Sequence, residues 1–125
     1  MKILGFDIGG TKCAVMTANW DGKEIELLKK DKCQTDRSLT PTQIIDKLIA
    51  MADNILDGKP EAIGISCGGP LDSKKGVIMS PPNLPGWDNV EIVKQLEAHY
   101  GVPAHLQNDA NACAVAEWKF GAGRG

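Results

Sequence analysis

The 125-residue sequence lacks the features that mark a nucleic-acid-binding or membrane protein. Its 14 basic residues stand against 16 acidic ones, and the net charge of −2 gives no basic excess of the kind that nucleic-acid binding requires. No apolar run is long enough to cross a bilayer, and no charged-then-apolar leader precedes the first predicted strand. We therefore expect one soluble, cytoplasmic domain with neither nucleic acid nor a membrane as partner.

Closely spaced cysteines are also missing. Cys13, Cys33, Cys67 and Cys113 stand far apart, and none forms a Cys-x-x-Cys pair. This spacing indicates neither a zinc knuckle nor a small disulfide framework, and it fits reduced thiols. A chain of this length buries roughly two-thirds of its unfolded surface, so it is expected to fold without such crosslinks.

The opening segment combines an apolar run with a glycine turn. The apolar run predicts a buried first strand, and Asp7 interrupts it near its end. A carboxylate in such a strand costs free energy unless a cation lies opposite. Gly9 and Gly10 lack Cβ atoms, so that backbone N–H groups can approach a phosphate closely, while Thr11 offers a hydroxyl and Lys12 a positive charge. The turn is therefore predicted to hold a phosphate beside a hydrated divalent ion.

A simple hairpin is the alternative interpretation of this turn. Gly-Gly between two apolar runs is a common tight turn, and residues 12–18 are typical of a returning strand. Both interpretations can hold together. The segment has neither the Gly-x-Gly-x-x-Gly nor the Gly-x-x-x-x-Gly-Lys-Ser/Thr spacing of other nucleotide-binding proteins, so a phosphate site needs a second site element elsewhere in the chain.

The remaining chain predicts an α/β fold built on a mixed five-stranded sheet, with three antiparallel strands first and helices on both faces. The clearest helix covers residues 40–57, where Thr40 is the N-cap, Pro41 the first helical residue and Gln43 the partner in a capping box. The other predicted elements are a third strand at 24–35, a parallel strand at 62–67, a short strand at 77–79, a helix capped by Asn89 and reaching Tyr100, a strand at 104–107 and an alanine-rich helix at 108–118.

Three further segments place polar or glycine residues beside predicted strand ends or in a stiff loop. Gly68 and Gly69 follow the strand at 62–67, where ligands gather in open α/β sheets, although a loop that needs glycine for its φ angles explains them equally. Asn83 lies in a loop stiffened by three prolines and suits a pair of sugar hydroxyls, or else an Asx turn. Asn108 or Asp109 is an N-cap in the simpler interpretation; in the other, Asp109 is an ionised acceptor for a hydroxyl nucleophile.

These motifs, in this order, resemble the first lobe of the ROK family of bacterial sugar kinases and sugar-responsive repressors, within the actin, hexokinase and Hsp70 superfamily. The resemblance covers essentially the whole chain. It rests on the motifs Asp7-Ile8-Gly9-Gly10-Thr11-Lys12, Cys67-Gly68-Gly69-Pro70-Leu71, Pro82-Asn83-Leu84-Pro85-Gly86-Trp87 and Leu106-Gln107-Asn108-Asp109-Ala110-Asn111-Ala112.

The resemblance implies a ribonuclease-H-like lobe of an ATP-dependent, glucokinase-like hexose kinase. By similarity, Asp109 is the catalytic base for the sugar 6-hydroxyl. Asp7 would orient hydrated Mg²⁺. The remaining roles are also carried over: Asn83 and Asn108 would hold ring hydroxyls, Gly68 and Gly69 would form the floor of the sugar pocket, and Gly9, Gly10, Thr11 and Lys12 would line the phosphates of ATP.

The sequence also departs from the family pattern. Family members continue into a second lobe with the adenosine site and a Cys/His zinc cluster, so we expect residues 1–118 to be an amino-terminal lobe and 119–125 a tail leading to a missing one. The fragment should be inactive alone, and the intact protein a homodimer. A sugar-sensing domain of a ROK-type regulator is the alternative, but regulators of this family carry a helix-turn-helix before the first strand, and here that strand begins at residue 3.

Overall fold

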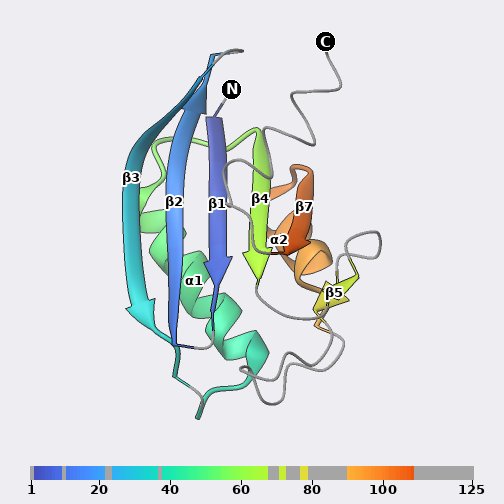
Figure 1. Ribbon diagram of the computed structural model, residues 1–125. Coiled ribbons are helices and arrows are strands. Elements are labelled where there is room, and N and C mark those ends of the chain that lie inside the picture. The colour runs from blue at the N-terminus through green and yellow to red at the C-terminus, as the bar shows by residue number, and fades with distance from the viewer. Residues whose placement is uncertain are drawn as a thin grey trace.

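The computed structural model describes residues 2–9, 11–21, 24–36, 38–67, 71–72, 77–78 and 90–108. Strands β1 (Lys2–Ile8), β2 (Lys12–Trp20) and β3 (Ile25–Gln34) form an antiparallel meander, and β4 (Ala62–Cys67) and β7 (Ala104–Asn108) extend it as parallel neighbours. The strand order is β3-β2-β1-β4-β7 (Figure 1). The mixed five-stranded sheet predicted from the sequence is confirmed.

A second, two-stranded sheet pairs β5 (Leu71–Asp72) with β6 (Val77–Ile78) in antiparallel fashion. The short strand expected at 77–79 is therefore confirmed at 77–78. The residues between these two strands lie outside the described residues.

Helix α1 (Pro41–Ile55) begins where its capping signals place it. The Thr40 side chain accepts a hydrogen bond from the Gln43 amide, and the Gln43 side chain accepts one from the Thr40 amide, which completes the capping box. The helix ends two residues earlier than the predicted 57, because Leu56 already has an extended backbone. The capping residues Thr40 and Gln43 lie close together in the sequence, which is why the sequence alone predicts where this helix begins.

Helix α2 (Ile92–Tyr100) begins later than predicted, and the expected N-cap at Asn89 is wrong. Glu91 occupies the N-cap position without a side-chain capping bond. Val90, the first residue of a helix capped by Asn89, instead forms an antiparallel bridge with Ile78, with both backbone hydrogen bonds at 2.9 Å. A backbone that is paired in this way cannot also enter the helix.

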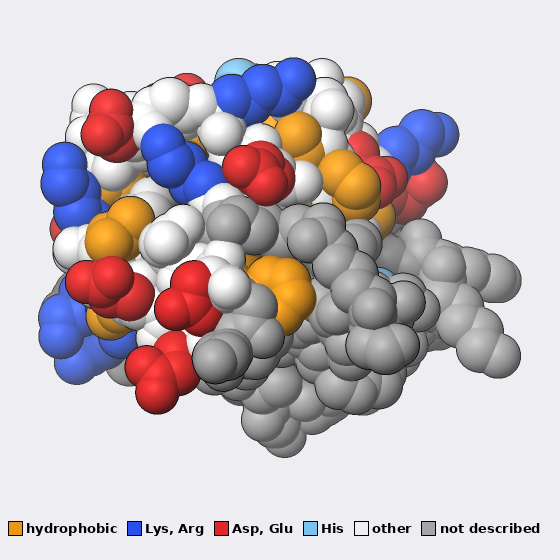
Figure 2. Space-filling view, turned by 90° about the horizontal axis from the view of Figure 1, so that it is seen from above, with side chains coloured by type: hydrophobic (Ala, Val, Ile, Leu, Met, Phe, Trp, Pro, Cys, Tyr) orange, Lys and Arg blue, Asp and Glu red, His pale blue; other side chains and the backbone are white. Residues whose placement is uncertain are grey.

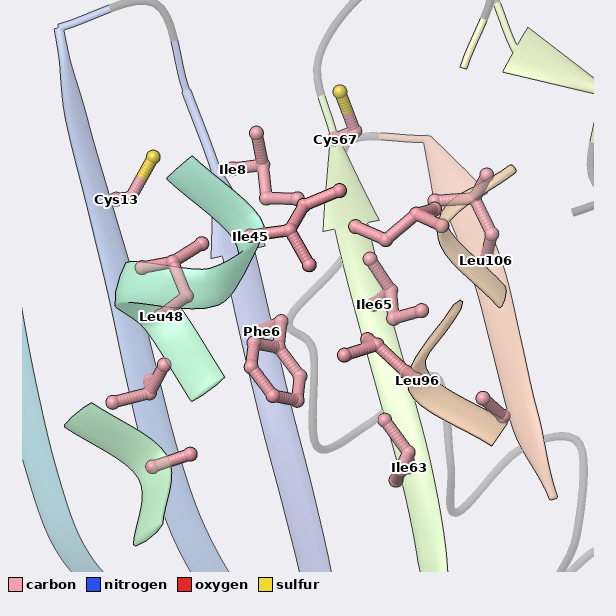
Figure 3. Close-up of a cluster of buried hydrophobic side chains, with 14 of the residues drawn as sticks. Phe6, Ile8, Cys13, Ile45, Leu48, Ile63, Ile65, Cys67, Leu96 and Leu106 are labelled. Atoms are coloured by element: carbon pink, nitrogen blue, oxygen red, sulfur yellow. The ribbon is translucent and has the colours of Figure 1, made fainter. Parts of the chain in front are cut away.

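The main hydrophobic core lies between one face of the sheet and both described helices (Figures 1 and 3). Phe6 and Ile65 project from the sheet toward Leu48 of α1 and Leu96 of α2, and all four side chains are buried. Helices α1 and α2 thus cover the same face. The helix predicted at 108–118 lies largely outside the described residues, so a helix on the second face stays a prediction.

The second face of the sheet carries a smaller buried apolar cluster. A separate buried cluster there consists of Ile3, Ala14, Met16, Ala18, Trp20 and Ala62. Five of the six are alanine, isoleucine or methionine, and three of these are alanine, so half of this cluster consists of small side chains.

A hydrogen bond joins the two helices. The Tyr100 hydroxyl of α2 donates to the Asp53 carboxylate of α1 at 3.1 Å, and His99 lies 3.5 Å from the same carboxylate. Burial, helped by the negative charge of Asp53, raises the pKa of Tyr100 well above its usual value, so that the phenol remains protonated and keeps donating. His99 of α2 therefore lies beside the same link between the two helices.

The charged side chains on the surface reflect the nearly equal numbers of basic and acidic residues. At the end of the molecule shown in Figure 2, basic and acidic side chains are interspersed over the described residues. Within the described part of the chain, neither helix has both the length and the apolar character that crossing a membrane demands.

We predict that Thr40→Ala lowers the free energy of unfolding by about 1 kcal/mol, because it removes the side-chain acceptor for the Gln43 amide. Urea titration of the two proteins measures this difference. Thr42→Ala is the matched control, since Thr42 is exposed and lies inside the first turn of the helix. Equal effects of the two substitutions would contradict the capping role.

Candidate functional site

The candidate phosphate loop joins β1 to β2 as a tight hairpin. Ile8 pairs with Cys13, and the Gly9 amide then donates to the Lys12 carbonyl at 3.1 Å. A Cβ atom on Gly9 would lie 2.8 Å from that carbonyl oxygen, closer than real Cβ contacts come. The hairpin interpretation is therefore confirmed, and the requirement for glycine at position 9 comes from the close approach of β2.

Asp7 lies near the carboxyl end of β1, beside Ala14 of β2 and Ser66 of β4 in the register of the sheet. Its side chain is exposed, although partial burial raises the pKa of this carboxyl above its usual value, with Lys30 opposing part of the rise. A carboxylate that loses solvation without a full countercharge is suited to a hydrated cation.

One or two protein carboxylates are enough for a Mg²⁺ ion when nucleotide phosphates and water complete its coordination shell. Among the described residues, no group of three or more His, Cys, Asp or Glu side chains is placed to hold a metal by itself. Asp7 alone therefore fits an ion that arrives with phosphate, and it does not fit a metal cage made only of protein side chains.

Thr11 and Lys12 are both exposed at the tip of the hairpin and the start of β2. Their hydroxyl and ammonium groups are thus open to a ligand on the side of the loop that faces solvent. The structure brings Asp7, Gly9, Thr11 and Lys12 together within one hairpin, as the sequence predicted. Gly10, which completes the predicted phosphate loop, lies outside the described residues.

The three parallel strands end in line. Ile8 of β1 is level with Cys67 of β4, and Cys67 is level with Asn108 of β7. Since neighbouring strands are about 4.8 Å apart, the end of β7 lies roughly 10 Å from the end of β1 across β4. The candidate phosphate hairpin and the end of β7 therefore lie at the same edge of the sheet (Figure 1).

The predicted sugar-side residues are described only in part. Asn108 is the last residue of β7, so its backbone belongs to a strand, which extends one residue beyond the predicted 107. Nothing is described of its side chain. The remaining predicted sugar-side residues, Gly68, Gly69, Asn83 and Asp109, lie outside the described residues.

Sequence reasoning missed Thr35 and Cys13 as parts of the site. The Thr35 hydroxyl donates to the Gly9 carbonyl at 2.7 Å, and the Cys13 thiol lies 3.2 Å from that hydroxyl. Thr35 is 26 residues from Gly9 in the chain. Its only signal in the sequence was its place at the end of the third predicted strand, which pairs with the strand leaving the hairpin.

The fold, together with the hairpin at the end of its first strand, defines a ribonuclease-H-like lobe of the actin-like ATPase type. Residues 3–125 match the model of the ROK family, and the chain belongs to that family.

The chain is similar over its whole length to the glucokinase of Thermotoga maritima, with 34% identity. A solved ROK hexokinase from Thermus thermophilus superposes on 94% of the chain with a TM-score of 0.72 and 39% identity. A ROK glucokinase from Streptomyces griseus, solved in complex with glucose and AMPPNP, matches the entire chain with a TM-score of 0.71 and 34% identity.

The chain spans less than half of each of these proteins. It covers 39% of the Thermotoga glucokinase and 38% of both solved kinases. The seven strands and two helices described above therefore correspond to one part of a larger family architecture.

We predict that Asp7→Asn raises the free energy of unfolding at pH 7 in the absence of metal and nucleotide. Because the pKa of Asp7 is raised in the folded state, the folded protein binds more protons than the unfolded one. Stability therefore falls as the pH rises from about 3.8, the ordinary value, through the folded pKa. The neutral amide removes this unfavourable contribution.

Urea titrations at pH 4 and pH 7 test the effect. The gain from Asp7→Asn should be larger at pH 7 than at pH 4. Asp46→Asn, at an exposed position on α1, is the control and should show no such gain. A variant less stable than the wild type at pH 7 would contradict the assignment of Asp7 as a carboxylate without a full countercharge.

Proposed function

We propose that the chain is the amino-terminal lobe of an ATP-dependent hexose kinase that transfers the γ-phosphoryl group of ATP to the 6-hydroxyl of glucose. The observation that carries this proposal is the alignment of the strand ends, with the Asp7 hairpin and Asn108 at one edge of the sheet roughly 10 Å apart. That spacing suits a donor phosphate held at the hairpin and an acceptor hydroxyl held beside β7.

The hairpin binds the donor. Gly9 and Gly10 let the backbone approach the phosphates, the Thr11 hydroxyl donates to a phosphate oxygen and the Lys12 ammonium offsets their negative charge. Asp7 holds a water ligand of the Mg²⁺ ion that accompanies ATP. When bound, this ion neutralises charge on the transferring phosphoryl group.

The segments around β4 and β7 bind the acceptor. Gly68 and Gly69 form the floor of the sugar pocket, and Asn83 and Asn108 hydrogen-bond ring hydroxyls. Asp109 accepts the proton of the 6-hydroxyl while the oxygen attacks the γ-phosphorus, and the bond from that phosphorus to the β,γ-bridging oxygen breaks. The products are glucose 6-phosphate, ADP and a protonated Asp109, which then loses its proton to water.

A second lobe completes the site. Residues 1–118 form the amino-terminal lobe and 119–125 lead toward the other, which supplies the adenosine pocket and the remaining sugar contacts. This division is supported by the share of the related kinases that the chain covers, 38–39%. We place the intact enzyme in the cytoplasm as a homodimer, because ATP is available there and cytoplasmic thiols are kept reduced.

We predict that Asp109→Ala in the full-length kinase lowers kcat about 100-fold to 10,000-fold, the usual contribution of a general base, while the dissociation constant for glucose changes little. A coupled assay for ADP measures turnover, and calorimetry measures glucose affinity. Asp46→Ala is the control because Asp46 is exposed on α1.

Undiminished turnover in Asp109→Ala would refute the catalytic assignment. A full-length protein that binds glucose but releases no ADP would instead support a sugar-sensing regulator. Calorimetric titration with mannose and N-acetylated hexosamines on the same protein would identify the preferred sugar.

We also predict that residues 1–125 alone phosphorylate no glucose, because the adenosine side of the cleft belongs to the second lobe. The test is the same ADP assay on the purified chain, with its Asp109→Ala variant as the control for contaminating kinases. ATP-dependent phosphorylation by the chain that disappears in the variant would show that this division of the site is wrong.

A further inference from the structure

The end of β3 makes a pair of contacts with the hairpin that the proposed function has not used. Thr35, the residue after β3, donates its amide N–H to the Thr11 carbonyl at 2.8 Å and its hydroxyl to the Gly9 carbonyl at 2.7 Å. One residue thus holds two carbonyl groups of the predicted phosphate loop, one on either side of Gly10.

The direction of these hydrogen bonds follows from counting protons. A threonine hydroxyl carries one proton, and Thr35 places it on Gly9. The Cys13 thiol, 3.2 Å from the same oxygen, must then be the donor of the pair. Burial raises the pKa of the Cys13 thiol, although its contacts with Thr35 and Gly9 oppose part of the rise, so the thiol is protonated and able to donate at neutral pH.

Strand β3 itself is largely exposed. Eight of its ten residues are exposed, and only Ile25 and Cys33 are partly buried. The strand lies at the edge of the sheet and contributes little to the core. Its most specific contacts with the predicted site are those made just beyond its last residue, by Thr35.

The orientation of the carbonyl groups in the hairpin affects how well it can bind an anion such as phosphate. A peptide group is planar and trans, so a carbonyl held toward one side turns the following N–H to the opposite side. With the Thr11 carbonyl bonded to Thr35, the Lys12 N–H faces away from β3. Carbonyl oxygens left unheld could rotate toward the phosphates, where their negative ends would repel the ligand.

We propose that Thr35 is a positioning residue for the nucleotide-binding hairpin: its two hydrogen bonds keep the carbonyl groups of Gly9 and Thr11 turned toward β3 and away from the phosphates of ATP. The inference rests on the proposed kinase function. It adds the residue that follows β3 to a site otherwise built from the ends of β1, β4 and β7, and it gives the end of this edge strand a part in substrate binding.

The test compares Thr35→Val, Thr35→Ser and Thr17→Val in the full-length kinase. Valine keeps the β-branched shape and removes the hydroxyl, whereas serine restores it. Thr17→Val is the matched control: it makes the same chemical change on β2, at a buried position opposite Leu4, about 17 Å along the strand from Lys12.

Loss of one hydrogen bond of this kind should raise the KM for ATP about tenfold in Thr35→Val, with the KM for glucose changed less than about twofold. Thr35→Ser should restore the KM for ATP, and Thr17→Val should leave it unchanged. An unaltered KM for ATP in Thr35→Val, an equal rise in both KM values, or the same shift in Thr17→Val would overturn the inference.

A second measurement separates this inference from the proposed function. Amide hydrogen exchange of Gly9, which donates to Lys12, reports the order of the hairpin without any substrate. Exchange should be about tenfold faster in Thr35→Val than in wild type and restored in Thr35→Ser; an unchanged rate would overturn the positioning role. A wild-type protein that consumes no ATP would refute the kinase proposal, and the exchange rates would still decide the role of Thr35.

Discussion

The parallel, in-register pairing of β1, β4 and β7 is the constraint on which the candidate site depends. Backbone hydrogen bonds fix Ile8, Cys67 and Asn108 at one level, so that whatever follows each strand leaves the sheet at a common edge. The main core supports this alignment from one side, where α1 and α2 pack against the alternate residues of the same strands. The sheet therefore decides which segments can share a ligand, and the helices keep its strands in place.

The hairpin adds a second constraint, which acts over a few ångströms. Gly9 must be glycine because β2 returns so closely that a side chain would collide with the Lys12 carbonyl. The same close return brings Cys13 and Thr35 against the Gly9 carbonyl. A loop of minimal size is thus held by three strands together, and Asp7 stands two residues before it with its carboxylate open to solvent.

The parts of the fold that the sequence predicted are those with local signals. Helix α1 was located by Thr40 and Gln43, which lie three residues apart and bond to each other, and the hairpin by its adjacent glycines. The start of α2 was misplaced because Val90 pairs with Ile78, and Thr35 was missed because its partner is 26 residues away. Neither contact leaves a pattern in nearby residues. Asp7, Gly9, Thr11 and Lys12 are predicted site residues on the basis of local chemistry, while the proposed roles of Asn83 and Asp109 depend on family resemblance.

The contact between Tyr100 and Asp53 affects how the two helices fray at their carboxyl ends. It links the last residue of α2 to the final turns of α1, and the Tyr100 ring also packs near Phe6 in the central strand, with ring centroids 6.4 Å apart. Fraying of the carboxyl end of either helix would therefore break the hydrogen bond between Tyr100 and Asp53 and remove a contact from the other helix. Through Tyr100, the ends of both helices are thus connected to each other and to β1.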